Sequence, residues 1–294
     1  MGPPSATLRK NGPDEVARAI KPLECVIFDC DGVIWRGQKK IEGAREAIAG
    51  LEAEGKRVLY LTNNSAKSRE QCASKLRNFG IEANPSQVVC SSSSAARYLD
   101  SVRFDKAKKV LVIGQEGILI ELAEAGYECV TCEDLCGSSD PECKIEEYER
   151  MELCIASLYL SSRESNAIFV ATNLDVGDRV GSDGRLIPGA GPCLAAIQTA
   201  SGREATNVGK GGEWLLPHLV ETLNLDAQRT CIVGDRLDTD IALGKQSGML
   251  TILPLTGVTS EEDLAGCAEG ERPDLVVESV AALVRGGGPA STEG

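Results

Sequence analysis

The sequence predicts an α/β protein with a doubly wound parallel β-sheet at its core. Short apolar runs alternate with helical patterns from residue 24 onward, which is typical of βαβ units. Polar residues directly follow several of these runs, and ligands of open α/β sheets bind at the carboxyl ends of the strands. The chain has 294 residues, of which 42% are hydrophobic, so it is long enough for about two domains with ordinary cores.

The strand candidates are short apolar runs bounded by polar or turn-forming residues. In chain order they are ECVIFD (24–29), RVLYLT (57–62), QVVCS (87–91), KVLVIG (109–114), AIFVAT (167–172), TCIVGD (230–235), LTILPL (250–255) and DLVVES (274–279). Between them, the spacing of apolar residues predicts helices over 44–54, 68–79, 117–125, 191–200, 213–223 and 240–246.

The order of these elements predicts a Rossmann-like core with a second unit inserted into it. We expect residues 21–100 and 205–285 to form the core and residues 101–204 to form the inserted α/β unit. The two tails, 1–20 and 286–294, are rich in Gly, Pro and Ser, which predicts that they are disordered.

Composition excludes several classes of function. Lys and Arg number 31 against 44 Asp and Glu, and the net charge of −13 disfavours binding to nucleic acid or to anionic lipid. No apolar run approaches the roughly 20 residues of a membrane span. The N-terminus lacks the apolar stretch of a signal peptide, so we expect a cytoplasmic protein, with the plastid stroma after removal of a transit peptide as the alternative. Several of the 12 cysteines, such as Cys25 and Cys231, lie in strand-like runs and are expected to pack as free thiols.

Two carboxylates follow the first strand candidate. Asp29 and Asp31 are two residues apart, which in an extended chain directs both side chains to the same side. Adjacent carboxylates repel each other unless a cation lies between them, so the pair predicts a divalent metal such as Mg²⁺. The simpler interpretation of this pair alone is an Asp turn before Gly32.

Three further strand ends carry polar residues. Each has an ordinary interpretation by itself, as a helix cap or as a solvated surface charge. These positions are Thr62, Asn63 and Asn64 after the second strand candidate, Lys210 in NVGKGG, and Asp235 with Asp240 in GDRLDTDIALG.

Taken together and in this order, the four positions resemble the motifs of the haloacid dehalogenase-like phosphohydrolases. FDCDGVIWRG, LTNNSAKSREQ, GDRLDTDIALG, TGVTSEEDL and PDLVVESVAAL are similar to the eukaryotic branch of 2-phosphoglycolate and pyridoxal phosphatases. The resemblance covers about residues 20–285.

The resemblance implies a role for each acidic residue. Asp29 is expected to be the nucleophile that forms an aspartyl-phosphate, and Asp31 the general acid and then the general base. Asp29, Asp235 and the backbone carbonyl of Asp31 are expected to bind Mg²⁺, while Asp240 orients the metal ligands.

The resemblance also implies how the substrate is bound. Thr62, Asn63, Asn64 and Lys210 are expected to bind the phosphoryl group, whose oxygens carry negative charge in the transition state. The expected substrate is a small phosphorylated metabolite, with 2-phosphoglycolate as first choice. Pyridoxal 5′-phosphate and a broad specificity for 4-nitrophenyl-phosphate-type esters are the alternatives. A non-catalytic binding protein with a damaged cap is the alternative from another class.

The inserted unit corresponds to the cap that this branch uses for substrate selection and dimerisation. Its sequence departs from the family over 143–160, where charged residues favour a helix in place of an apolar strand. We therefore expect the cap to lack one strand and its loop. A rearranged cap, a poorly stable cap and a variant gene product each account for this, and a homodimer through the cap depends on which one holds.

The cap also holds a cluster of cysteines, Cys129, Cys132, Cys136 and Cys143. A zinc site or a redox module accounts for such a cluster. Structural zinc sites pair two such knuckles across a longer spacer, so we expect reduced thiols here.

Overall fold

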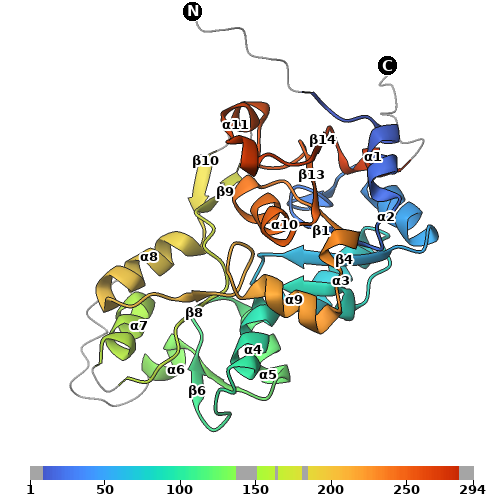
Figure 1. Cartoon of the computed structure of the whole chain (residues 1–294). Helices are drawn as coiled ribbons and strands as arrows, with labels where there is room; N and C mark the ends of the chain where they lie inside the picture. Colours follow the sequence, from blue (N-terminus) through green and yellow to red (C-terminus); the bar gives the residue numbers. More distant parts are fainter. Residues whose placement is uncertain (1–8, 137–150, 163–164, 181–184, 285–294) are drawn as a thin grey trace, which may run out of the picture. The chain divides into compact units, whose positions relative to one another are not determined.

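The computed structural model describes residues 9–136, 151–162, 165–180 and 185–284, and Figure 1 traces the chain. The chain divides into two compact units. Unit 1 takes the described residues of Met1–Thr62, Ala73–Val89 and Leu216–Gly294, and unit 2 takes those of Asn63–Cys72 and Cys90–Leu215. None of the helices in the described ranges combines the length and the apolar character that crossing a membrane requires.

Unit 1 is built on a six-stranded sheet in the order β14-β13-β12-β1-β4-β5. The pairs β1–β4, β1–β12, β12–β13 and β13–β14 are parallel. From β1 the chain adds strands outward to β5, and it later returns beside β1 to add strands in the other direction, so the sheet is doubly wound as predicted. The strands are β1 (Cys25–Phe28), β4 (Arg57–Thr62), β5 (Val88–Cys90), β12 (Thr230–Val233), β13 (Leu250–Pro254) and β14 (Leu275–Val277).

The sheet forms here because its strands are continuously apolar. All four residues of β1 and of β12 are buried, as expected for central strands that helices cover on both faces. Helix α2 shows the matching pattern, with Ala44, Ala47, Ile48 and Leu51 buried along one side. The helices of unit 1 are α1 (Pro13–Ile20), α2 (Ala44–Ala53), α3 (Arg69–Asn78, shared with unit 2), α9 (Leu215–Leu223), α10 (Ala242–Ser247) and α11 (Glu261–Gly266).

Smaller elements complete unit 1. Directly after β1 the chain forms a short antiparallel hairpin. One turn of π-helix precedes α10. The elements are β2 (Trp35–Arg36), β3 (Lys39–Lys40), η1 (Pro85–Gln87), η3 (Ala227–Arg229), η4 (Leu237–Ile241), η5 (Glu269–Glu271) and η6 (Val280–Leu283).

The prediction that residues 1–20 are disordered is wrong for 13–20. These residues form α1, whose Val16 and Ile20 are buried, with Pro13 in the first turn where a missing N–H costs nothing. The backbone N–H of Asn11 donates to the Val276 carbonyl (2.7 Å), and the Asn11 side-chain oxygen accepts from the Val276 N–H (2.8 Å). Because the tail is rich in Gly and Pro, its sequence did not predict this short amphipathic helix. Residues 1–8 and 286–294 lie outside the described residues.

Unit 2 contains short strands that pair two by two. β6 pairs with β7 and β8 with β11, both in parallel, while β9 and β10 form an antiparallel hairpin. The elements are α4 (Ser91–Ser101), β6 (Lys109–Leu111), α5 (Glu116–Glu124), β7 (Glu128–Val130), α6 (Cys132–Cys136), α7 (Met151–Ser161), β8 (Val170–Ala171), β9 (Gly177–Val180), β10 (Arg185–Pro188), α8 (Ala190–Ser201) and β11 (Thr206–Asn207).

The described part of the atypical segment is helical. Residues 151–161 form α7, and in the described ranges no strand joins the β6–β7 pair to the β8–β11 pair. Two separate apolar clusters result, one between α4 and α5 around Leu122 and Tyr127, and one between α7 and α8 around Leu160 and Ile197. The expectation of a cap without one strand stays a prediction, because residues 137–150 lie outside the described residues.

The cysteines predicted to pack in strands do so. Cys25 in β1 is 4% exposed and Cys231 in β12 is fully buried. Burial raises the pKa of the Cys25 thiol to about 11, and it raises the pKa of Cys231 further in the same direction. Both thiols are therefore protonated and behave as small apolar side chains.

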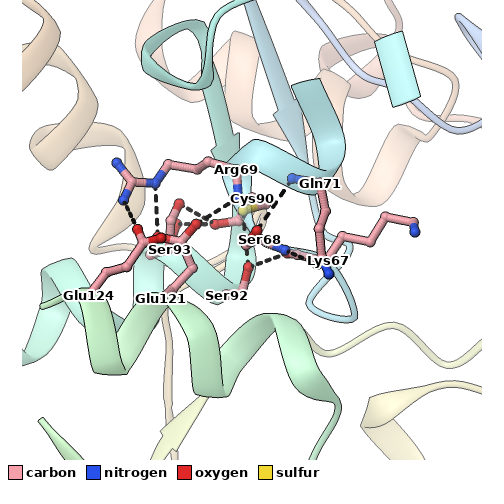
Figure 2. Close-up of polar contacts among 10 residues, drawn as sticks. Lys67, Ser68, Arg69, Gln71, Cys90, Ser92, Ser93, Glu121 and Glu124 are labelled. Carbon is pink, nitrogen blue, oxygen red and sulfur yellow. Dashed lines mark hydrogen bonds and ion pairs between the residues drawn. The ribbon is translucent and has the colours of Figure 1, made fainter. Parts of the chain in front are cut away.

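An ion pair to the buried carboxylate of Glu121 anchors the segment Asn63–Cys72 within unit 2 (Figure 2). Arg69 Nε donates to Glu121 Oε2 at 2.8 Å, and the Arg69 backbone N–H donates to Glu121 Oε1 at 2.6 Å. The Glu121 side chain is only 2% exposed. Ser92 Oγ adds a bond to the Lys67 carbonyl at 2.6 Å. A buried carboxylate needs this pairing because its desolvation is costly.

We predict that Arg69→Met destabilises the protein by about 3 kcal/mol, because Glu121 stays buried without its cation. Urea unfolding followed by tryptophan fluorescence measures this change. The matched control is Lys109→Met, which breaks an exposed ion pair with Glu128 in the same unit and should leave stability unchanged. An equal loss in both variants would contradict the assignment.

Candidate active site

Three buried carboxylates meet at the switch point of the sheet. Asp29, Asp235 and Asp240 each offer an oxygen, and these oxygens lie within 4.8 Å of one another. The side chains are 5%, 2% and 0% exposed, respectively, so water screens their charges poorly. In open α/β sheets this crevice, beside the first strand and at the carboxyl ends of the strands, is where ligands bind.

The parallel pairing of β1 with β12 brings Asp29 and Asp235 together. Phe28 lies opposite Val233, the Asp29 N–H continues the ladder to the Val233 carbonyl (2.8 Å), and Asp235 follows two residues after that carbonyl. Asp235 Oδ2 accepts from the Val258 N–H at 2.6 Å, which fixes one of its oxygens. A Cβ at Gly32 or at Gly257 would overlap the Asp235 carboxylate, so both positions require glycine.

Asp240 reaches the cluster from the π-helical turn. Its Oδ2 accepts from the backbone N–H of Arg236 at 3.3 Å, across that turn. The sequence prediction placed Asp240 in the first turn of a helix, and η4 runs directly into α10. A π-turn is a common feature of functional sites because it redirects one side chain out of the helical register.

The cluster fits a divalent cation. Three carboxylates in a buried space repel one another, and oxygen-only donors are what Mg²⁺ binds. Within the described ranges these residues are the one group of three or more His, Cys, Asp or Glu that is close enough to hold a metal ion. Of the predicted cysteine cluster, Cys129 and Cys132 are not in disulfides, whereas Cys143 lies outside the described residues.

The Asp31 side chain, which follows β1, accepts a hydrogen bond from an aromatic residue. Its Oδ1 accepts from the indole Nε1 of Trp35 at 2.7 Å, and the side chain is exposed. Trp35 itself is 3% exposed, and it packs on Phe79 (5.8 Å between centroids) with Lys75 Nζ 4.0 Å above the ring. The sequence did not predict this hydrogen bond from Trp35 to Asp31.

The predicted phosphate-binding residues belong to both units. Thr62 is the last residue of β4 in unit 1 and is 4% exposed. Asn63, Asn64 and Lys210 belong to unit 2. Asn64 Oδ1 accepts from the Ala66 N–H at 3.0 Å in a local turn. Lys210 is buried and lies in the turn between β11 and α9. The sequence predicted a helix over 213–223, and α9 begins a few residues after Lys210.

The side chain of Asn63 is engaged within unit 2. Its Oδ1 accepts from the Lys210 N–H at 2.7 Å, and its Nδ2 donates to Asp175 Oδ1 at 3.0 Å. Asn173 Nδ2 donates to the Asn63 carbonyl at 3.0 Å. The sequence analysis did not select Asn173 or Asp175, although both follow the strand candidate AIFVAT. The rule that polar residues after strands form sites applied there as well.

Comparison with known proteins places this chain among hydrolases. Residues 26–128 match the haloacid dehalogenase-like hydrolase family, and residues 207–283 match a HAD-hydrolase-like family. Phosphoglycolate phosphatase 1A, chloroplastic, from Arabidopsis thaliana is 36% identical over 289 residues, which is 89% of this chain and 76% of the relative. Mouse chronophin is 36% identical over 277 residues, which is 89% of this chain and 92% of chronophin.

Solved structures agree with this comparison. A glycerol phosphate phosphatase from Mycobacterium tuberculosis, solved in complex with magnesium, superimposes with a TM-score of 0.73 at 27% identity, covering 90% of this chain and 78% of the other. A 4-nitrophenylphosphatase from Thermotoga maritima has a TM-score of 0.74 at 27% identity, covering 90% and 97%.

We predict that Mg²⁺ stabilises the folded protein through the carboxylate cluster. A ligand that binds only the native state at about 100 times its Kd adds about 2.7 kcal/mol, which thermal unfolding with Mg²⁺ or with chelator detects. Asp235→Asn should remove this gain and, in chelator, should equal or exceed the wild type in stability because one repelling charge is gone.

The matched control for this experiment is Asp238→Asn, an exposed carboxylate in the same turn that pairs with Arg236. This variant should keep the full Mg²⁺ effect. An equal gain from Mg²⁺ in the Asp235→Asn variant would overturn the assignment of the metal site.

Proposed function

Because this chain belongs to the haloacid dehalogenase-like hydrolases and is a phosphatase, we propose that it hydrolyses a small phosphorylated metabolite through an aspartyl-phosphate on Asp29. The first-choice substrate is 2-phosphoglycolate, which gives glycolate and phosphate. The observation that carries this proposal is the buried cluster of Asp29, Asp235 and Asp240 directly after the two central strands, with Asp31 two residues beyond Asp29.

Asp29 serves as the nucleophile. Its carboxylate needs no deprotonation, so an oxygen attacks phosphorus directly and the bond from phosphorus to the ester oxygen breaks. The Asp29 backbone N–H donates to the Val233 carbonyl of β12, which restrains the backbone that carries the nucleophile. A preorganised nucleophile of this kind avoids the entropic cost of bringing the reactants together.

Asp31 transfers the protons of both half-reactions. It donates a proton to the departing ester oxygen, and it then accepts a proton from the water that attacks the aspartyl-phosphate and releases phosphate. The Trp35 indole holds one oxygen of Asp31 at 2.7 Å, which restricts the carboxyl group to one orientation. The exposure of Asp31 allows it to exchange protons with solvent between turnovers.

Asp29, Asp235 and Asp240 are the side chains that would hold Mg²⁺, with Asp29 and Asp235 binding the ion together with the Asp31 carbonyl and Asp240 orienting them. When bound, Mg²⁺ neutralises the repulsion between the carboxylates and the phosphate dianion. Thr62, Asn63, Asn64 and Lys210 would bind the phosphoryl group, Asn63 through its backbone because its side chain is engaged. The Lys210 ammonium supplies the positive charge of this set.

Unit 2 bears on the choice of substrate. Its described strands form separate pairs over two apolar clusters, in place of one continuous sheet. A less rigid cap excludes competing substrates less well, because discrimination depends on groups held in place around the leaving group. We therefore expect a preference for 2-phosphoglycolate over pyridoxal 5′-phosphate and 4-nitrophenyl phosphate of less than about a thousandfold in kcat/KM.

Phosphate release from these three esters, with Mg²⁺ and with chelator, tests the proposal. We predict turnover that requires Mg²⁺ and that is highest with 2-phosphoglycolate. Asp29→Asn should keep the fold and lose more than about 99% of the activity, because an amide is a poor nucleophile.

The control variant for this assay is Asp238→Asn, which should retain activity. Full activity in chelator, or substantial turnover by Asp29→Asn, would refute the mechanism. A preference above about a thousandfold would show that the cap discriminates as a rigid one does.

A further inference from the structure

The loops after β8 and β11 lie side by side in unit 2. Thr206 pairs with Val170 and Asn207 with Ala171, and the Val208 N–H continues the ladder to the Ala171 carbonyl at 2.9 Å. Parallel pairing brings the carboxyl ends of both strands to the same edge. The segment 172–175 therefore meets the turn that carries Lys210.

Asn63 joins these two loops through both ends of its side chain. The Lys210 backbone can only donate, so the bond of 2.7 Å assigns the accepting oxygen of the amide to that side. The amide nitrogen then needs an acceptor, and Asp175 Oδ1 supplies it at 3.0 Å. A charged acceptor makes a stronger hydrogen bond than a neutral one.

Asp175 is itself fixed from several directions. Its carbonyl accepts from the Gly191 N–H (2.9 Å) at the start of α8, and its N–H donates to Asn173 Oδ1 (3.1 Å). Asn173, 7% exposed, returns to the Asn63 carbonyl through Nδ2. On the other side, a Cβ at Gly209 would overlap the Thr172 carbonyl and Asn63 Oδ1, so only glycine permits this approach.

We propose that Asp175 is a positioning residue for this enzyme: its carboxylate orients the Asn63 amide, and the amide fixes the backbone of Lys210. The inference rests on the proposed function, because Lys210 matters for catalysis only if it binds the phosphoryl group. Asp175 acts indirectly, because its carboxylate orients the Asn63 side chain, which in turn positions Lys210.

The physical reason is the precision that phosphoryl transfer requires. A displacement of about 1 Å in a charged group that stabilises the transition state costs about a hundredfold in rate. Lys210 lies in a glycine-flanked turn, NVGKGG, with no regular structure of its own to fix it. The bond from its N–H to Asn63 supplies that restraint, and Asp175 prevents the amide from rotating away.

A swap of the two side chains tests the pair directly. Asn63→Asp places two carboxylates against each other and should lower kcat/KM by at least about tenfold. Asp175→Ala removes the acceptor and should do the same. In the double variant N63D/D175N, the new carboxylate still accepts from Lys210 and now accepts from the new amide, so kcat/KM should recover to within about threefold of wild type.

Hydrogen exchange at the Lys210 amide gives a readout that does not depend on activity. In the wild-type protein this amide should be protected, and in each single variant it should exchange at least about tenfold faster. The double variant should restore protection. Gln198→Ala is the matched control, because it removes another bond of a unit 2 amide side chain to a loop N–H, that of Ala205 (3.0 Å). This control should leave exchange at Lys210 unchanged.

The outcomes separate this inference from the proposed function. If the wild type hydrolyses no phosphomonoester, the proposed function fails while the exchange data still decide whether Asp175 fixes Lys210. Unchanged exchange at Lys210 in Asp175→Ala overturns the inference, and so does an N63D/D175N variant whose kcat/KM is no higher than that of Asn63→Asp alone. If Asp175→Ala fails to fold, the comparison of the double variant with Asn63→Asp alone decides.

Discussion

Repulsion among three buried carboxylates is the constraint on which the site depends. Asp29, Asp235 and Asp240 come from separate positions in the chain, and their oxygens lie within 4.8 Å of one another in a space with little water. Such a group is unfavourable unless a cation balances it, so the fold must hold the three side chains against their own charge. The ladder between β1 and β12, the N–H of Val258 and the π-turn before α10 provide that restraint. Unit 1 therefore holds a prearranged set of oxygen ligands.

Unit 2 is organised by polar contacts as much as by its core. The buried Glu121 pairs with Arg69 and thereby holds the segment that also contains Asn63. Asn63 in turn connects the loops of Asp175 and Lys210. Its apolar residues, by contrast, divide into two clusters. The hydrogen-bonded loops of unit 2 are thus more tightly restrained than its apolar residues. We therefore expect weak discrimination between substrates, because discrimination requires groups that are held rigidly around the substrate.

The sequence was sufficient to predict the sheet and the acidic cluster. Polar residues follow the buried apolar runs of these parallel strands, so Asp29, Asp235 and Asp240 were selected by local pattern. The separate role of each came only from the resemblance to a family. Helix α1 was missed because the Gly and Pro of the first residues outweighed the spacing of Val16 and Ile20. Asp175 was not selected although it follows the strand candidate AIFVAT, and its contact with Asn63 depends on the pairing of β8 with β11, which no local pattern encodes. The bond from Trp35 to Asp31 was missed because a side-chain contact within a hairpin depends on the turn geometry.

The proposed mechanism requires Asp29 to carry the phosphoryl group during turnover. The most direct measurement uses Asp31→Asn with 4-nitrophenyl phosphate, whose leaving group departs without a proton, so that this variant lacks only the base that activates water against the intermediate. After incubation with Mg²⁺ and 4-nitrophenyl phosphate and an acid quench, mass spectrometry of the peptide containing residue 29 should show the added mass of one phosphoryl group on Asp29. The same label must be absent from the Asp29→Asn variant. A phosphoryl group found on another residue, or unimpaired steady turnover by Asp31→Asn, would contradict this mechanism.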